Sequence, residues 1–308
     1  MKTVNLHILI VIFLGNLLLP AGVYAEQLVI DGDRQFEFGR ELMHDGKYEL
    51  AVKEFERFMH FFPDDQRVSS ARYLTGVCYL RQGRYKDARQ VFTEIFSSNP
   101  DGEFAGNSVF MMGETYYEEG FPEKAEYFFA EAAKKYPSSD LKNAAFYRLG
   151  WARMREHRWK EASEEFGRVE KGSSLYDSAQ ALAKQSLKGE LLPSKDPVTA
   201  GVMAGVVPGL GHVYLSRYKD AAVAFLLNGL FIWATVESFQ QDHNVLGGIL
   251  AFFELGWYAG NIYSAVNGAH KYNRKVRDDF SKSFRDRLDL RILTSRKGPE
   301  GVLLTFQF

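Results

Sequence analysis

The chain has 308 residues and a formal net charge of -1, and 46% of its residues are hydrophobic. This length allows about two domains. The balanced charge gives no reason to expect nucleic acid as a partner, and the composition is that of a folded protein. The hydrophobic residues are unevenly spread, because residues 198–269 are apolar and rich in Gly, Phe and Tyr, whereas the region before them is charged.

Residues 1–25 have the pattern of a secretory signal peptide. Lys2 gives a positive start, residues 6–19 form an apolar core, and Val23 and Ala25 are small residues at a cleavage site. No Cys directly follows this site, so the signal is not that of a lipoprotein. The sequence therefore predicts export with cleavage. The alternative is an N-terminal membrane anchor that stays attached.

Residues 32–170 contain four residue types that recur at a fixed spacing of 37 residues. The recurring small residues are Gly39, Gly76, Gly113, Gly150, Ala51, Ala88, Ala125 and Ala162. The recurring larger residues are Phe55, Phe92, Phe129, Phe166, Pro63, Pro100 and Pro137. Joint recurrence at a period in this range is typical of a helical repeat array, which presents an extended surface to other proteins.

Each unit is expected to contain a helix, a turn, a second helix and a Pro-marked turn. In the first unit Gly46 marks the turn, and Pro63 ends the second helix. Ala51, Phe55 and Phe58 lie at i, i+4 and i+7 of that helix, which is the spacing of one buried face. The recurring Gly and Ala indicate close helix contacts, and the recurring Phe is expected to fill the space between neighbouring units.

The pattern resembles the tetratricopeptide repeat, with Gly at the eighth position, Ala at the twentieth, an aromatic at the twenty-fourth and Pro at the thirty-second. The period is longer than the usual length of about 34 residues. Aromatic residues three before each Gly, together with the segment 79–88, are similar to a bacterial envelope subgroup. That subgroup includes the repeat subunit of the outer-membrane β-barrel assembly machine and the periplasmic repeat protein of the Tol-Pal system. The resemblance implies an exported setting.

The fourth unit departs from this pattern. His157 stands where the turn Gly is expected, Trp159 replaces the aromatic of the turn, and Ser174 stands where Pro is expected. Residues 175–189 are predicted to form a final helix. End units of a solenoid are often atypical because they cap the core, so capping is preferred over a functional role for His157.

The first helices of such an array line its inner face, where a partner is expected to bind. The predicted protein-binding residues are Arg40, Tyr73, Arg81, Glu114, Tyr117, Glu118, Trp151 and Arg155. Mixed charge with aromatic side chains suits a peptide or a protein surface. The alternative for Tyr73 and Trp151 is that they pack between units.

Beyond a linker at residues 191–197, residues 198–270 are predicted to be embedded in a membrane. Residues 221–239 and 245–265 are two apolar runs with one charge each, and each run is about the length that crosses the hydrocarbon core. The alternative is a buried helical hairpin in a soluble domain.

A motif before the first run resembles the entry motif of small bacterial two-transmembrane-helix domains, and this resemblance implies membrane insertion. Its residues are Pro208, Gly209, Gly211, His212, Tyr214 and Arg217. A lone His is weak evidence for a metal, so no metal site is predicted. Glu254 in the second run is a functional candidate, because ionisable groups inside a span face protein or water. Its alternative role is to hydrogen-bond Asn228 or Asn261 across the hairpin.

The charges that flank the two runs conflict with the leader. The loop 238–244 has no Lys or Arg, while both flanks are basic, which by the positive-inside rule puts the flanks in the cytoplasm. Export puts the repeats in the periplasm. A third crossing by residues 198–215 resolves the conflict, and so does insertion in the outer membrane. We give the leader precedence, because it exports the repeats before the hairpin inserts.

Residues 271–308 form a basic tail. A β-hairpin is expected there between residues 289–293 and the alternating residues Val302, Leu304, Phe306 and Phe308.

No catalytic residue and no cofactor are predicted. The sequence has no P-loop, no dinucleotide-binding Gly pattern, no paired His/Glu motif and no nucleophile elbow. Cys78, the only Cys, lies on a predicted helix and is expected to be a small buried hydrophobe.

The expected fold is all-α. Residues 26–190 form a tetratricopeptide-type helical solenoid of four units and a capping helix, followed by a transmembrane helical hairpin and a short β-hairpin tail. The expected function is a membrane-tethered periplasmic scaffold that binds envelope proteins or peptides in envelope assembly or maintenance. The inner membrane is favoured over the outer membrane as its anchor. The alternative is a component of a membrane transport or channel complex, with the hairpin as the working part.

Overall fold

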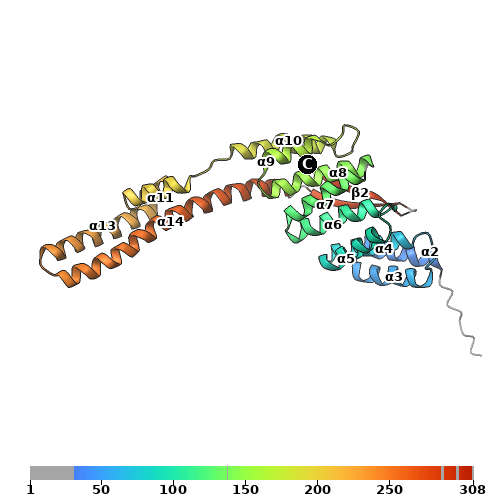
Figure 1. The fold of residues 1–308 in the computed structure, drawn as a ribbon, viewed down its shortest axis with the longest axis horizontal. Coiled ribbons are helices and arrows are strands. Elements are labelled where there is room, and N and C mark those ends of the chain that lie inside the picture. The colour runs from blue at the N-terminus through green and yellow to red at the C-terminus, as the bar shows by residue number, and fades with distance from the viewer. Residues whose placement is uncertain (1–30, 137, 286–287, 296–297, 307–308) are drawn as a thin grey trace, which may run out of the picture.

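The structure is a computed structural model, and it describes residues 31–136, 138–285, 288–295 and 298–306. The predicted leader and Pro137 lie outside the described residues. The molecule is elongated, with a compact helical array at one end and a long helical hairpin at the other (Figure 1). One continuous helix joins the two ends.

Eight helices form four helix–turn–helix pairs, one for each 37-residue unit. They are α2 (Gly32–His44), α3 (Tyr48–Phe61), α4 (Val68–Arg81), α5 (Tyr85–Ser98), α6 (Ala105–Glu119), α7 (Pro122–Lys135), α8 (Ser139–Arg155) and α9 (Trp159–Gly167). The predicted final helix is present as α10 (Tyr176–Ser186), which ends in the 3-10 helix η1 (Leu187–Leu191). The predicted tetratricopeptide-type solenoid is therefore confirmed, because successive helices pack against their neighbours along the chain.

The recurring Gly and Phe of each unit touch each other. A Cβ atom at Gly113 would lie 2.6 Å from the ring of Phe129, and the same relation holds for the glycines of the other three units. The four Phe rings are completely buried. The expected position of these rings, between neighbouring units, is corrected here. Each ring fills the space beside the glycine of its own unit, where a side chain is missing.

The turn between the two helices of a unit requires a left-handed residue. Gly46, Gly83 and Gly120 take this conformation with φ of 75°, 71° and 98°. His157 takes it in the fourth unit with φ of 62°. The fourth turn therefore keeps the geometry of the others although its residue differs, and the positive φ strains a side chain that glycine would lack.

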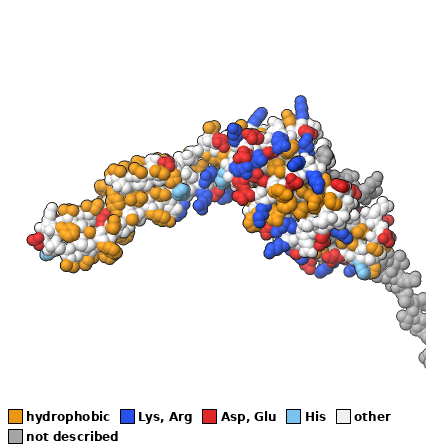
Figure 2. Space-filling view, in the orientation of Figure 1, with side chains coloured by type: hydrophobic (Ala, Val, Ile, Leu, Met, Phe, Trp, Pro, Cys, Tyr) orange, Lys and Arg blue, Asp and Glu red, His pale blue; other side chains and the backbone are white. Residues whose placement is uncertain are grey.

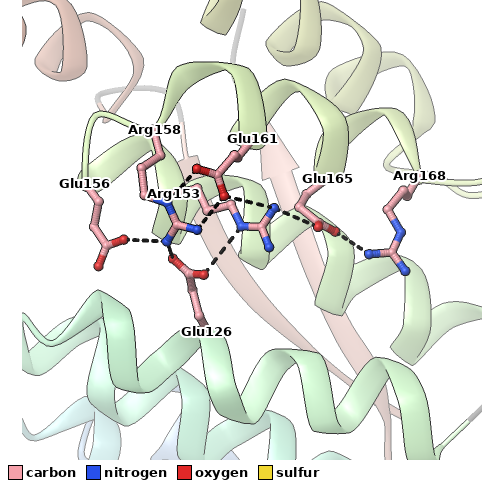
Figure 3. A network of polar contacts seen from close by, with 7 residues as sticks. All are labelled: Glu126, Arg153, Glu156, Arg158, Glu161, Glu165 and Arg168. Atoms are coloured by element: carbon pink, nitrogen blue, oxygen red, sulfur yellow. Dashed lines mark hydrogen bonds and ion pairs between the residues drawn. The ribbon is translucent and has the colours of Figure 1, made fainter.

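A network of charged side chains ties the fourth unit to the third (Figure 3). Glu126 of α7 accepts hydrogen bonds from Arg158 at 2.7 Å and from Arg153 at 3.4 Å. Arg153 also pairs with Glu165 at 2.9 Å, and Glu165 pairs with Arg168 at 2.8 Å. Burial raises the pKa of Glu126, and the guanidinium of Arg158 opposes that rise. The network links α7, α8 and α9 by several contacts and so fixes the end of the array.

Four helices form the other end of the molecule: α11 (Pro197–Val206), α12 (Leu210–Tyr214), α13 (Tyr218–Gln240) and α14 (Asn244–Arg285). Helix α14 has 42 residues, which at the usual rise gives a length of about 63 Å. It runs along α13 and then on to the repeats (Figure 1). There Phe280 packs edge-on against the ring of Trp159, with the centroids 5.2 Å apart. The hairpin is thus joined to the array by a continuous helix that ends in a packed contact.

The chain ends in an antiparallel pair of strands, β1 (Leu288–Ser295) and β2 (Gly298–Phe306), in which Leu290 lies opposite Leu304. These strands match the predicted β-hairpin, although its last residue, Phe308, lies outside the described residues. The strand β2 runs beside α8 and α4, which are first helices of their units (Figure 1).

Candidate functional site

The predicted protein-binding residues fall into two groups. Arg81 and Glu118 are exposed, and Arg40 and Arg155 are half-buried. The other four, which are at most 7% exposed, are Tyr73, Glu114, Tyr117 and Trp151. These four side chains pack inside the array. Packing of this kind is the alternative to a binding role for Tyr73 and Trp151. A role of the eight residues in binding stays a prediction.

Glu114 is held by a buried ion pair between the third and fourth units. The guanidinium of Arg148 donates from Nη2 to Glu114 Oε2 at 2.6 Å, and both side chains are at most 1% exposed. The same guanidinium lies 4.3 Å from the centre of the Tyr117 ring. Burial raises the pKa of Glu114, and the positive charge of Arg148 opposes the rise. This arrangement fixes the angle between α6 and α8, which gives Glu114 a structural function.

The C-terminal hairpin lies close to first helices of the array. Tyr73 on α4 and Tyr147 on α8 are at most 2% exposed because they pack within their own units, against Phe92 and Phe166. The strand β2 runs beside these same two helices. The C-terminal hairpin of the chain therefore lies along its own inner face. Sequence reasoning missed this contact, because a pairing between segments so far apart leaves no periodic signal.

Cys78 offers no thiol chemistry. It is completely buried in the array, and burial raises its pKa to about 12. A thiol at neutral pH is then protonated, and the thiolate is the reactive form. Among the described residues, no group of three His, Cys, Asp or Glu side chains gathers to hold a metal ion.

The described residues include two helices long and apolar enough to cross a membrane, α13 and most of α14. The most apolar stretch of α13 is 11% buried inside the protein, and that of α14 is 17% buried. Core helices of a soluble domain would be mostly buried, so the outward apolar surface favours membrane association. Figure 2 shows this surface as hydrophobic side chains along the hairpin, next to a charged array.

The short helices α11 and α12 form a reversal and not a crossing. The backbone N–H of Asp196 before α11 donates to the hydroxyl of Tyr214 at the end of α12, at 3.0 Å. Gly209 makes the reversal with φ of 88°, and a Cβ atom there would lie 2.4 Å from the carbonyl oxygen of Ala221. A third crossing by residues 198–215 is therefore wrong, because ten residues of α11 reach only about 15 Å before the chain returns.

The entry motif holds this reversal against α14. Pro208 lies in the turn itself. A Cβ atom at Gly211 would lie 2.3 Å from the carbonyl oxygen of Ala200, so only glycine permits this approach. Arg217 pairs with Asp220 at 2.8 Å at the start of α13. His212 is 3% exposed, and its Nδ1 has no hydrogen-bond partner among the described residues.

Asn261 completes the reversal, which corrects the expected pairing of Glu254. The side chain of Asn261 accepts from the N–H of Gly209 at 3.2 Å and donates to the carbonyl of Ala204 at 3.0 Å. Asn228 donates to the carbonyl of Ala224 at 2.6 Å. Neither reaches Glu254, whose two carboxyl oxygens are buried and have no hydrogen-bond partner in the described part of the chain.

The comparisons with known proteins agree with the repeat geometry. The family model of the tetratricopeptide repeat matches residues 36–103, which cover most of the first two units. A search of curated proteins finds no match.

Several solved structures resemble the chain weakly. A tetratricopeptide repeat protein from Parabacteroides merdae is 16% identical, over 82% of this chain and 97% of that one, with a TM-score of 0.40. MamA from Desulfovibrio magneticus RS-1 is 17% identical, over 64% and 93%, with a TM-score of 0.38. PilF of Pseudomonas aeruginosa is 15% identical, over 73% and 97%, with a TM-score of 0.39. Similarities at this level carry no conclusion about function.

Proposed function

We propose that this protein is a membrane-tethered scaffold of the bacterial envelope that binds other proteins through its repeat array. The observation that carries the proposal is the continuity of α14, which joins an outward-facing apolar hairpin to a helical solenoid. Repeat arrays of this type present extended surfaces to proteins, and α14 holds that surface at a fixed distance from the membrane.

We further propose that the array lies in the periplasm, with the inner membrane as the anchor. The reversal at α11 and α12 and the full length of α14 put the array and both basic flanks at the same end of the hairpin. For this end of the molecule, the positive-inside rule therefore predicts the cytoplasm, whereas the leader predicts the periplasm. The leader takes precedence, because a domain already exported fixes its side before a later hairpin inserts.

The binding surface is proposed to be the inner face and its rim. Arg81 and Glu118 are exposed there with opposite charges, which suits a partner of mixed charge. The C-terminal hairpin lies along the same face. A partner that uses this face has to displace the hairpin or bind beside it.

In-cell crosslinking tests the proposal. A photoreactive residue replaces Arg81 or Glu118, and matched controls replace the exposed Lys53 or Lys134 on second helices. The proposal predicts that the same envelope protein is captured from both inner-face positions and from neither control, as identified by mass spectrometry. Capture at equal yield from the controls, or no capture from either inner-face position, would contradict it.

A transport function is the second candidate, and the unpartnered carboxyl group of Glu254 favours it. An ionisable side chain inside a span often belongs to a proton or ion pathway. Glu254→Gln keeps the shape and removes the charge. If the protein is only a scaffold, this variant captures the same partner and supports growth as well as the wild type. If Glu254 carries ions, growth fails while partner capture persists.

A further inference from the structure

A cleft of about 940 Å³ opens between α12, α13 and α14. Along α14 it extends from Phe252 to Ser264, which corresponds to about 18 Å of helix. The hydrocarbon core is about 30 Å thick, so the cleft covers roughly one leaflet. The cleft lies in the half of the hairpin that is nearer to the array.

The lining of the cleft is polar where α13 begins and mostly apolar farther along, where Asn228 is a polar exception. Arg217 and Asp220 lie at its mouth, where α13 begins. Farther along, its walls are formed by Leu227, Trp257 and Phe252. An amphiphile with a charged head and a hydrocarbon chain matches this order, because each part then meets groups of its own polarity.

Two nearly buried polar groups line the cleft without a hydrogen-bond partner among the described residues. They are Nδ1 of His212, a side chain that is 3% exposed, and Oδ1 of Asn228, a side chain that is 2% exposed. Such groups are costly in an apolar medium unless a ligand completes their hydrogen bonds. A neutral imidazole Nδ1 and the carboxylate of Asp220 can both accept hydrogen bonds, so a headgroup beside them is expected to supply donors. Asn228 lies about 12 Å farther along α13, beyond the reach of the same headgroup.

We propose that this cleft binds one membrane phospholipid whose headgroup carries both a phosphate and a primary amine. The guanidinium of Arg217 is suited to the phosphate, and the amine supplies N–H donors to Asp220 and to Nδ1 of the nearby His212. The mouth carries one positive and one negative charge, Arg217 and Asp220. It therefore matches a zwitterionic headgroup better than a purely anionic one. The acyl chain lies along Leu227 and Trp257. This inference rests on the proposed insertion of the hairpin in a membrane.

Fluorescence quenching by brominated phospholipids tests the site in the full chain reconstituted into vesicles. Trp257 lines the cleft, whereas Trp233 is 64% exposed on α13 outside it. The variant Trp233→Phe leaves the cleft reporter, and Trp257→Phe leaves the control reporter. Trp151 and Trp159 lie in the array and give a constant background. Brominated phosphatidylethanolamine, phosphatidylcholine and phosphatidylglycerol are each mixed into unbrominated phosphatidylcholine.

The proposal predicts that phosphatidylethanolamine quenches Trp257 at a mole fraction several-fold lower than the other two lipids do, while Trp233 shows no preference. The double variant Arg217→Gln and Asp220→Asn loses the preference, and Lys271→Gln, an exposed basic residue outside the cleft, keeps it. Equal quenching of Trp257 by all three lipids, or a preference for phosphatidylglycerol, would overturn the proposal. If no lipid quenches either reporter, the hairpin is not in the bilayer, and the failure then belongs to the proposed membrane anchor.

Discussion

Single residues set the geometry of each repeat unit, because the recurring Gly and Phe occupy one shared volume. Replacing Gly113 with Ala adds a methyl group 2.6 Å from the buried ring of Phe129. Alanine is a better helix former than glycine by about 1 kcal/mol, but overpacking a closed core costs about 1–3 kcal/mol. We expect a net loss of unfolding free energy in denaturant titrations of the purified protein. Gly167→Ala is the control, because no atom lies within 4 Å of that added methyl group. Equal stability of the two variants would contradict the packing account.

The buried pair of Glu114 and Arg148 gives a second test at this scale. Glu114→Ala leaves the guanidinium buried without its partner, which typically costs about 3–5 kcal/mol. Replacing both, with Arg148→Leu added, is expected to recover much of the loss, because no uncompensated charge then remains. Lys53→Ala breaks an exposed pair with Glu49 and serves as the control, with stability expected to stay unchanged. A single Glu114 variant as stable as the Lys53 variant would show that the buried pair is unimportant.

His157 predicts a pH dependence of stability. Burial lowers the pKa of His157, the nearby Arg277 lowers it further, and Asp278 opposes both. The unfolded chain, in which a His titrates near about 6.5, then binds the proton more readily than the folded chain does. Stability is therefore lost as the pH falls through that value toward the lower pKa of the folded state. We expect the melting temperature to fall more on acidification in the wild type than in His157→Asn, since Asn tolerates the left-handed turn and does not titrate. Parallel pH curves for the two proteins would contradict this.

At the scale of the elements, the C-terminal hairpin decides whether the inner face is open. Ending the chain after residue 285 removes β2 from beside α4 and α8, and we expect Trp151 of α8, which is 3% exposed in the full chain, to become more accessible. Iodide is then expected to quench more of the tryptophan fluorescence of the truncated protein than of the full chain. The same comparison in a Trp151→Phe background is the control, and the difference should vanish there. Unchanged quenching on truncation would mean that the hairpin does not cover this face.

The sequence predicts the elements that depend on local periodicity. The helix pairs follow from the recurrence of Gly, Ala and Phe, and the two long helices follow from unbroken apolar runs. Contacts between distant segments leave no such pattern. The reversal held by Asn261 and the position of β2 beside α4 and α8 depend on which segments meet in space. For the same reason, Glu114 looks like a surface acid in the sequence, although its partner Arg148 lies buried beside it.

At the scale of the whole molecule, the array, the hairpin and their joining helix form a rod with two different ends. One end carries the repeats and all the basic flanks, and the other end carries the loop at residues 241–243. The central claim is that these two ends lie on opposite sides of a membrane, with the repeats outside the cytoplasm.

Cysteine labelling tests this claim most directly, because Cys78 is the only natural Cys and is buried. A single new Cys replaces Ser97 in the array or Asn244 at the loop, both of which are exposed. Intact spheroplasts are treated with a maleimide that does not cross membranes. We expect labelling of Ser97→Cys before lysis and of Asn244→Cys only after lysis, with no labelling of the wild type. The reverse order would put the array in the cytoplasm, and labelling of both variants before lysis would show that the hairpin does not cross the membrane.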